Sequence, residues 1–172
     1  MATNIAIDIG TSKIVLASGN KIVLELPSVV TVDTDTREPV YFGEKAFETI
    51  GRTPDSLTCV FPIQRSVIAD YDVAESMLKE YMTAAFGNRI IKPKVMVVMP
   101  SGVTAMQHHS VADVVEASGG RNAETIEAPL AVLAAFQPEI VDDRFAVGLD
   151  DADDLDDALG ILPAVVFRGM SR

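Results

Sequence analysis

The opening stretch, residues 4–13, most constrains what this chain can fold into. Isoleucine occupies every second position from Ile5 to Ile9, which is the two-residue period of a β-strand. The strand leads into a turn of small residues that begins at Gly10, and a second apolar run begins at Lys13. The pattern therefore predicts two consecutive strands joined by a short turn.

The residues of this turn are typical of phosphate binding. Gly10 lets a ligand approach the backbone closely, and the N–H groups and hydroxyls of Thr11 and Ser12 can point at phosphate oxygens. Asp8, near the end of the strand, can hold a hydrated Mg²⁺ ion. An ordinary hairpin in which Asp8 and Thr11 satisfy the turn explains the same residues, so the turn alone leaves both interpretations open.

Composition indicates a globular protein of the cytoplasm. The chain has 172 residues, a net charge of −11 and one cysteine. Because a single cysteine cannot form an internal disulfide, it fits a reducing compartment. The length suffices for one core and a small lobe. We find no apolar run long enough to cross a bilayer and no signal peptide, and the negative charge argues against nucleic-acid binding.

The first third of the chain predicts strands followed by a small lobe. A third strand is expected over residues 21–26, and tight turns make the first three strands antiparallel. Residues 33–65 then read as a small, irregular lobe. It contains a short strand at 40–42, a short helix over 44–50 and extended chain at 57–61.

The second half alternates helices and strands. The predicted order is a helix over residues 72–86, a strand at 94–99, a helix at 104–118, a strand at 123–127 and a helix after Pro129. Asp72, with Glu75 three residues later, is the predicted N-cap of the first of these helices. The side chains predicted to face inward from the second are Met106, Val111, Val114 and Val115. The adjacent His108 and His109 cannot chelate one metal ion and are expected at the surface.

This order of elements predicts an α/β fold whose sheet combines antiparallel and parallel strands, with helices on both faces. Ligands of such sheets bind at the carboxyl ends of strands, near the point where connections diverge. Asp8, Ser101-Gly102 and Glu127-Ala128 all lie at the ends of predicted strands. Their convergence favours a nucleotide site at this edge.

Five short motifs carry a resemblance to a known family. They are Ile7-Asp8-Ile9-Gly10-Thr11, Pro27-Ser28-Val29-Val30, Gly51-Arg52-Thr53-Pro54, Val67-Ile68-Ala69-Asp70 and Met99-Pro100-Ser101-Gly102-Val103-Thr104. In residues and order, over about residues 4–136, they resemble the N-terminal half of MreB, the bacterial actin homologue that determines rod shape. The sequence of residues 10–13 is also similar to the FtsA cell-division actin. The Arg-Thr-Pro and Pro-Ser-Gly-Val-Thr motifs favour MreB, and sugar kinases and Hsp-type chaperones share only the fold and the first turn.

The resemblance implies a ribonuclease H-like, actin-type ATPase domain I that is incomplete relative to the family. Residues 1–32 and 66–137 would form subdomain IA, and residues 33–65 would form a lobe like subdomain IB. Residues 138–172, which contain an acidic block at residues 150–157, resemble nothing in the family. We expect them to form a poorly ordered acidic tail.

The resemblance also implies that the turn binds ATP with Mg²⁺. Gly10, Thr11, Ser12 and Lys13 would bind the nucleotide, and Asp8 would hold the Mg²⁺ ion through water. On this interpretation the opening turn is the first phosphate loop of an actin-type ATPase.

Two departures from the family lower the expected activity. Relatives carry a glutamate that activates the attacking water, directly before the proline that opens a helix, and here that position is Ala128. Glu127 lies one residue earlier, but adjacent strand residues face opposite sides, so it cannot simply substitute. The chain also ends before the family's second phosphate loop and adenine-binding segment. ATP binding is therefore expected to be weak or absent.

Residues 90–91 occupy the place of a hydrophobic loop that helps MreB relatives insert into lipid. Ile90 and Ile91 are flanked by Arg89, Lys92 and Lys94. Bulky apolar residues with basic flanks suit an anionic membrane surface. The alternative is that both isoleucines pack beneath the neighbouring helix.

The sequence thus predicts an MreB-like, cell shape-determining protein, here truncated, that forms or joins actin-like filaments. We expect it in the cytoplasm, peripheral to the inner face of the membrane. Its expected partners are further copies, cell-shape and elongation proteins and the membrane surface, without nucleic acid. Two alternatives stay open, namely a functional actin-like ATPase completed by another chain, and a nucleotide-independent adaptor of the FtsA type.

Overall fold

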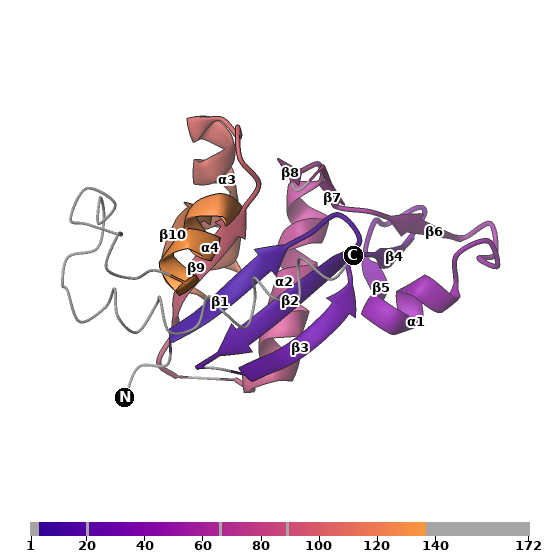
Figure 1. The fold of residues 1–172 in the computed structure, drawn as a ribbon. Helices are drawn as coiled ribbons and strands as arrows, with labels where there is room; N and C mark the ends of the chain where they lie inside the picture. Colours follow the sequence, from indigo (N-terminus) through magenta and orange to yellow (C-terminus); the bar gives the residue numbers. More distant parts are fainter. Residues whose placement is uncertain (1–3, 20, 66, 89, 137–172) are drawn as a thin grey trace.

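The computed structural model describes residues 4–19, 21–65, 67–88 and 90–136 (Figure 1). The strands are β1 Asn4–Ile9, β2 Lys13–Ser18, β3 Lys21–Pro27, β4 Val30–Asp33, β5 Pro39–Phe42, β6 Leu57–Val60, β7 Ile63–Gln64, β8 Val67–Ile68, β9 Lys94–Met99 and β10 Arg121–Glu127. The helices are α1 Gly43–Glu48, α2 Tyr71–Phe86, α3 Ala105–Ala117 and α4 Ala128–Phe136.

A five-stranded sheet in the order β10-β9-β1-β2-β3 lies at the centre of the fold. Strands β1, β2 and β3 are antiparallel neighbours, whereas β1, β9 and β10 run parallel. Tight turns suffice for the antiparallel pairs, and α3 provides the crossover that joins the parallel strands β9 and β10. This mixed sheet confirms the α/β fold predicted from the sequence.

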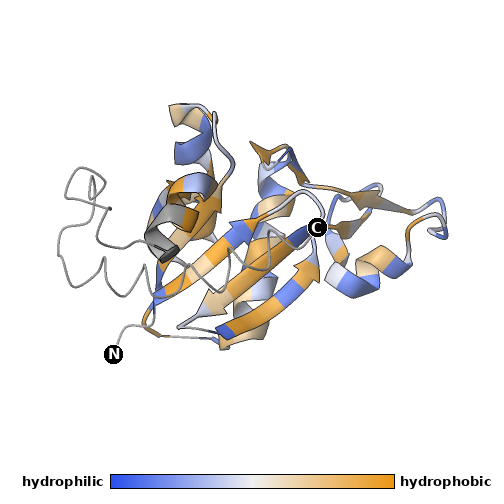
Figure 2. Ribbon diagram, viewed as in Figure 1, coloured by the Kyte–Doolittle hydropathy of each residue, from blue (hydrophilic) through white to orange (hydrophobic). Residues whose placement is uncertain are grey.

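The larger core lies between one face of the sheet and helices α2 and α3. It contains Ile5, Ile7 and Ile9 of β1 together with Met77 and Leu78 of α2, all of which are buried. Alternate residues of a strand point to the same face, so the three isoleucines share this side. Burying each of these side chains stabilises the fold by roughly 1.5–3 kcal/mol. Figure 2 shows how strongly hydrophobic residues concentrate in the strands.

The opposite face of the sheet carries smaller side chains. Ala6 and Ala17 pair directly across β1 and β2, and they form a buried cluster with Val98 of β9 and Ala131 of α4. Figure 1 shows α4 in front of β9 and β10, on the side away from α2. Helices therefore cover both faces, as an α/β architecture requires.

A second sheet, in the order β5-β4-β6, lies beside the main sheet together with α1 (Figure 1). Gly43 begins α1 at a φ of 57° and donates its N–H to the Val29 carbonyl. A Cβ atom there would lie 3.1 Å from the hydroxyl oxygen of Tyr81, which itself donates to the Pro27 carbonyl. Tyr81 of α2 thus contacts both the end of β3 and the start of α1.

The small sheet and α1 fall mostly within residues 33–65, although β4 begins earlier, at Val30. The division of the chain into subdomains remains a prediction. Residues 138–172, for which an acidic tail was predicted, lie outside the described residues.

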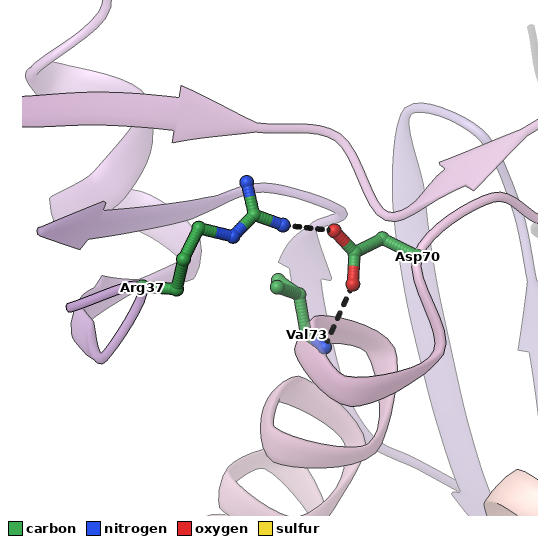
Figure 3. A network of polar contacts seen from close by, with 3 residues as sticks. All are labelled: Arg37, Asp70 and Val73. Atoms are coloured by element: carbon green, nitrogen blue, oxygen red, sulfur yellow. Dashed lines mark hydrogen bonds and ion pairs between the residues drawn. The ribbon is translucent and has the colours of Figure 1, made fainter. Parts of the chain in front are cut away.

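Helix α2 begins earlier than predicted, and Asp72 is not its N-cap. The N-cap is Asp70, whose backbone is extended and whose Oδ1 accepts the Val73 N–H at 3.3 Å. Its other carboxylate oxygen pairs with the guanidinium of Arg37, in the turn between β4 and β5 (Figure 3). Asp72 lies within the first helical turn, where it can only complement the helix dipole.

Helix α3 begins at a capping box formed by Thr104 and Gln107. Val111, Val114 and Val115 are buried as predicted, but Met106 is 78% exposed. The prediction for Met106 was wrong because of helix geometry. At 3.6 residues per turn, a residue five positions before Val111 lies roughly 140° around the axis from it.

Candidate functional site

The carboxyl ends of the parallel strands meet at one edge of the main sheet. In the register, Asp8 of β1 pairs with Val98 of β9, and Val98 pairs with Ile126 of β10. The Gly10 turn, the residues after β9 and the start of α4 therefore lie at the same edge. This is the edge at which the sequence predicts a nucleotide site.

Ser28 holds the Gly10 turn in place. Within the turn, the Gly10 N–H donates to the Lys13 carbonyl at 3.1 Å. The Ser28 hydroxyl donates to the Gly10 carbonyl at 2.7 Å, and the Ser28 N–H donates to the Ser12 carbonyl at 3.0 Å. Ser28 is only 1% exposed, so water does not compete strongly for these bonds. Ser28 belongs to the Pro27-Ser28-Val29-Val30 motif, but no pattern in the sequence indicated this role.

The side chains of the turn differ in their surroundings. Ser12 is exposed and Thr11 is half-buried. Lys13, predicted to bind nucleotide, forms an ion pair with Glu25 of β3 at 2.9 Å, with about a quarter of each side chain exposed. Pairs that water can reach contribute about 0–1 kcal/mol, so a phosphate could compete for this lysine at small cost.

Asp8 and Glu127 lie on opposite faces of the sheet. Asp8 shares its row with Val98 and Ile126, and both of these belong to the cluster beneath α4. Glu127 pairs with Met99, which belongs to the core beneath α2 and α3. The side chain of Glu127 therefore projects from the face of the sheet opposite to that of Asp8, the residue proposed to support the metal ion.

Ala128 lies on the side of Asp8. It is the first residue of α4, and its half-buried side chain packs against the cluster that contains Ile126. The candidate site thus has the carboxylate of Glu127 on one face of β10. At the position where the family resemblance places the catalytic carboxylate, it has the methyl group of Ala128.

His108 is not a free surface residue. It is half-buried, and its Nδ1 lies 2.8 Å from the hydroxyl oxygen of Thr125, which links α3 to β10. Only His109 matches the expectation of a surface position, with its Nε2 lying 3.6 Å from a carboxylate oxygen of Asp113. The sequence did not signal the contact of His108 with Thr125, because the two residues meet only when the crossover packs on the sheet.

Among the described residues, no group of three histidine, cysteine or acidic side chains is arranged to hold a metal ion. A carboxylate that holds Mg²⁺ through water needs no such group, because Mg²⁺ keeps several of its own water ligands. Asp8, half-buried one residue before the end of β1, has the donor type and the place that such a role requires.

Ile90 and Ile91 are exposed, at 102% and 63%. They do not pack beneath the neighbouring helix, so this alternative from the sequence is wrong. The described residues contain no helix long and apolar enough to span a membrane.

The fold and the strand edge together define an actin-like protein. The crystal structure of MreB5 of Spiroplasma citri bound to AMPPNP superposes with a TM-score of 0.70 at 27% identity, over 79% of this chain and 42% of that one. A MamK double helical filament matches with a TM-score of 0.66 at 20% identity, over 80% of this chain and 44% of that one, and this shows the fold alone.

The particular family follows from the sequence comparisons. The MreB/Mbl protein family matches residues 2–140, and the chain belongs to this family. The cell shape-determining protein Mbl of Bacillus subtilis is 33% identical over 144 residues, which are 80% of this chain and 43% of Mbl. MreB of Escherichia coli K12 is 30% identical over 137 residues, which are 76% of this chain and 40% of MreB. The chain thus spans less than half the length of these relatives.

Proposed function

We propose that this chain acts as an MreB-like cytoskeletal protein, which self-associates into or joins actin-like filaments in the cytoplasm at the inner face of the membrane. Its relatives are cell shape-determining proteins, and the MamK neighbour forms a double helical filament. Elongation and cell-shape proteins are its proposed partners.

We further propose that the Gly10 turn binds the phosphates of ATP, weakly. The observation that carries this proposal is the Ser28-held turn beside Asp8, at the carboxyl edge of parallel strands. Gly10, Thr11, Ser12 and Lys13 would contact phosphate, and the MreB5 relative was solved with AMPPNP and with ADP. Mg²⁺, held through water by Asp8, would neutralise phosphate charge.

Binding is weak in this proposal because one short loop covers little of a nucleotide. Affinity requires contacts that exceed the cost of immobilising the ligand, and ligand sites normally bury most of the ligand's surface. For these contacts the described residues supply the Gly10 turn, the half-buried carboxylate of Asp8, and Lys13, which Glu25 already engages.

Two measurements test this function. Isothermal titration of the whole chain with Mg·ATP should give a dissociation constant weaker than micromolar, and micromolar or tighter binding would contradict the weak site. Sedimentation velocity over a concentration series should show assemblies larger than one chain. A monomer at every concentration, with and without Mg·ATP, would contradict self-association.

The membrane part of the proposal depends on the exposed pair at residues 90–91. Pelleting with vesicles should decrease when Ile90→Asp and Ile91→Asp are combined, because charged side chains cannot enter the apolar part of the interface. The control replaces two exposed hydrophobic residues of β3 instead, Ile22→Asp with Val23→Asp. Equal pelleting by wild type and the residue 90–91 variant would contradict membrane insertion at this loop.

A further inference from the structure

A cavity of about 160 Å³ lies between the end of α2, the loop that precedes β9 and the end of α3. Met82 and Phe86 form an apolar part of its wall, and Lys79 and Lys92 contribute the charged side chains. Among the described residues that line it, none has an acidic side chain. Two of its lining residues, Lys92 and Pro93, directly follow Ile90 and Ile91 in the sequence. The elements that form the cavity differ from those at the proposed nucleotide edge.

We propose that this cavity binds the phosphate-bearing headgroup of an anionic phospholipid, and so fixes how Ile90 and Ile91 meet the membrane. This inference rests on the proposed membrane association and names its ligand. The volume admits a small polar group such as a phosphate ester, while the apolar wall suits the first carbons that a lipid carries beyond its phosphate.

The local charge favours an anion over a cation. Helices α2 and α3 both end at the cavity, and each helix carboxyl end carries about half a negative elementary charge. The two lysines carry two positive charges and outweigh these ends. Among the described residues, neither Lys79 nor Lys92 forms an ion pair. Both lysines are exposed, so both remain available to a ligand.

A local cluster of positive charge would let this acidic chain bind an anionic surface. With a net charge of −11, the chain as a whole is repelled by an anionic surface. Screening limits such interactions to about 8 Å at physiological ionic strength, so the charges nearest the membrane decide whether it binds. A pair of lysines beside two exposed isoleucines provides both attractions that interfacial binding needs.

The test measures binding of the whole chain to vesicles of phosphatidylglycerol with phosphatidylcholine, and to vesicles of phosphatidylcholine alone. Wild type should prefer the anionic vesicles. Lys79→Gln with Lys92→Gln should bind these vesicles at least about tenfold more weakly, since each lysine near a charged surface contributes about 1 kcal/mol. The control pair Lys45→Gln with Arg52→Gln removes the same charge from exposed sites at and just after α1, outside the cavity, and should change binding less than about twofold.

A second pair of variants separates a cavity from a charged surface. Thr83→Phe fills the cavity without changing charge, whereas Ala84→Phe places the same side chain on the next, exposed residue of α2, which does not line it. Only Thr83→Phe should weaken binding to anionic vesicles. Equal effects of the two lysine pairs, or of the two phenylalanine variants, would overturn the headgroup site.

The outcomes also distinguish this inference from the proposed function. If the residue 90–91 aspartate variant loses binding while Lys79→Gln with Lys92→Gln retains it, membrane association stands and the headgroup site is refuted. If inorganic phosphate shifts the NMR signals of the cavity but vesicles do not bind, the cavity holds a free anion, and both the headgroup site and the membrane proposal fail.

Discussion

Ser28 connects the proposed phosphate turn to the segment between β3 and β4. Its hydroxyl and its N–H bond two different carbonyl groups of the turn, those of Gly10 and Ser12. The next residue back, Pro27, accepts the Tyr81 hydroxyl, and burial raises the pKa of Tyr81 well above its usual range. Through this bond from Tyr81, α2 supports the segment that holds the turn.

Replacing Ser28 with alanine should destabilise the fold by about 1–3 kcal/mol, because the buried Gly10 carbonyl loses its donor. Urea denaturation followed by circular dichroism measures this change. The matched control is Ser18→Ala at the far end of β2, where a half-buried hydroxyl bonds the Asn4 carbonyl at 3.3 Å, and it should cost clearly less. Equal losses of stability from the two variants would contradict a particular role of Ser28 in stabilising the Gly10 turn.

At the scale of elements, periodicity predicted most of the structure. Alternation located β1, the continuous apolar run located β9, and helical spacing placed Val111, Val114 and Val115 inside. Met106 is an error of helical spacing itself, and the other errors concern residues whose role depends on tertiary contacts or backbone angles. The choice between Asp70 and Asp72 as N-cap depends on where the chain turns from extended to helical, and Arg37 lies 33 residues away from its partner.

The cap of α2 can be tested directly. Asp70→Ala removes both the helix cap, typically about 1 kcal/mol, and the partner of Arg37, whose exposed pair contributes at most about 1 kcal/mol. Asp70→Asn retains an acceptor for the Val73 N–H, so it should lose only the ion pair, as Arg37→Ala does. Thermal denaturation should rank Asp70→Ala as the most destabilising of the three.

Asp72→Ala is the control for this series, and it should cost less than Asp70→Ala, about 0.3–1 kcal/mol, because Asp72 complements only the helix dipole. A loss from Asp72→Ala as large as that from Asp70→Ala would restore Asp72 as the N-cap.

At the scale of the whole molecule, the family and its fold were predictable because five motifs keep their order between residues 7 and 104. The meeting of the strand ends at one edge, where the nucleotide site is proposed, also followed from the order of elements. The cavity beside Lys79 and Lys92 did not, because it forms where the ends of α2 and α3 meet a loop. No single stretch of sequence contains that arrangement.

The register of the sheet leads to a prediction about hydrolysis. Ala128 lies on the face of Asp8, whereas Glu127 starts from the other face. Since a correctly placed general base contributes about 10²–10⁴-fold, Ala128→Glu should raise the rate of phosphate release, by up to about 10²-fold if the new carboxylate reaches the attacking water. Single-turnover hydrolysis at high ATP and Mg²⁺ concentrations measures the rate despite weak binding.

Glu127→Gln is the matched control, because it removes the neighbouring carboxylate while keeping its size. It should leave the slow wild-type rate unchanged, since its face of β10 packs toward α2 and α3 rather than toward Asp8. If Glu127→Gln abolished hydrolysis while Ala128→Glu did nothing, the attacking water would lie on the opposite face. Hydrolysis would then take place on the face of the sheet that carries Glu127, and Asp8 would lie on the other face.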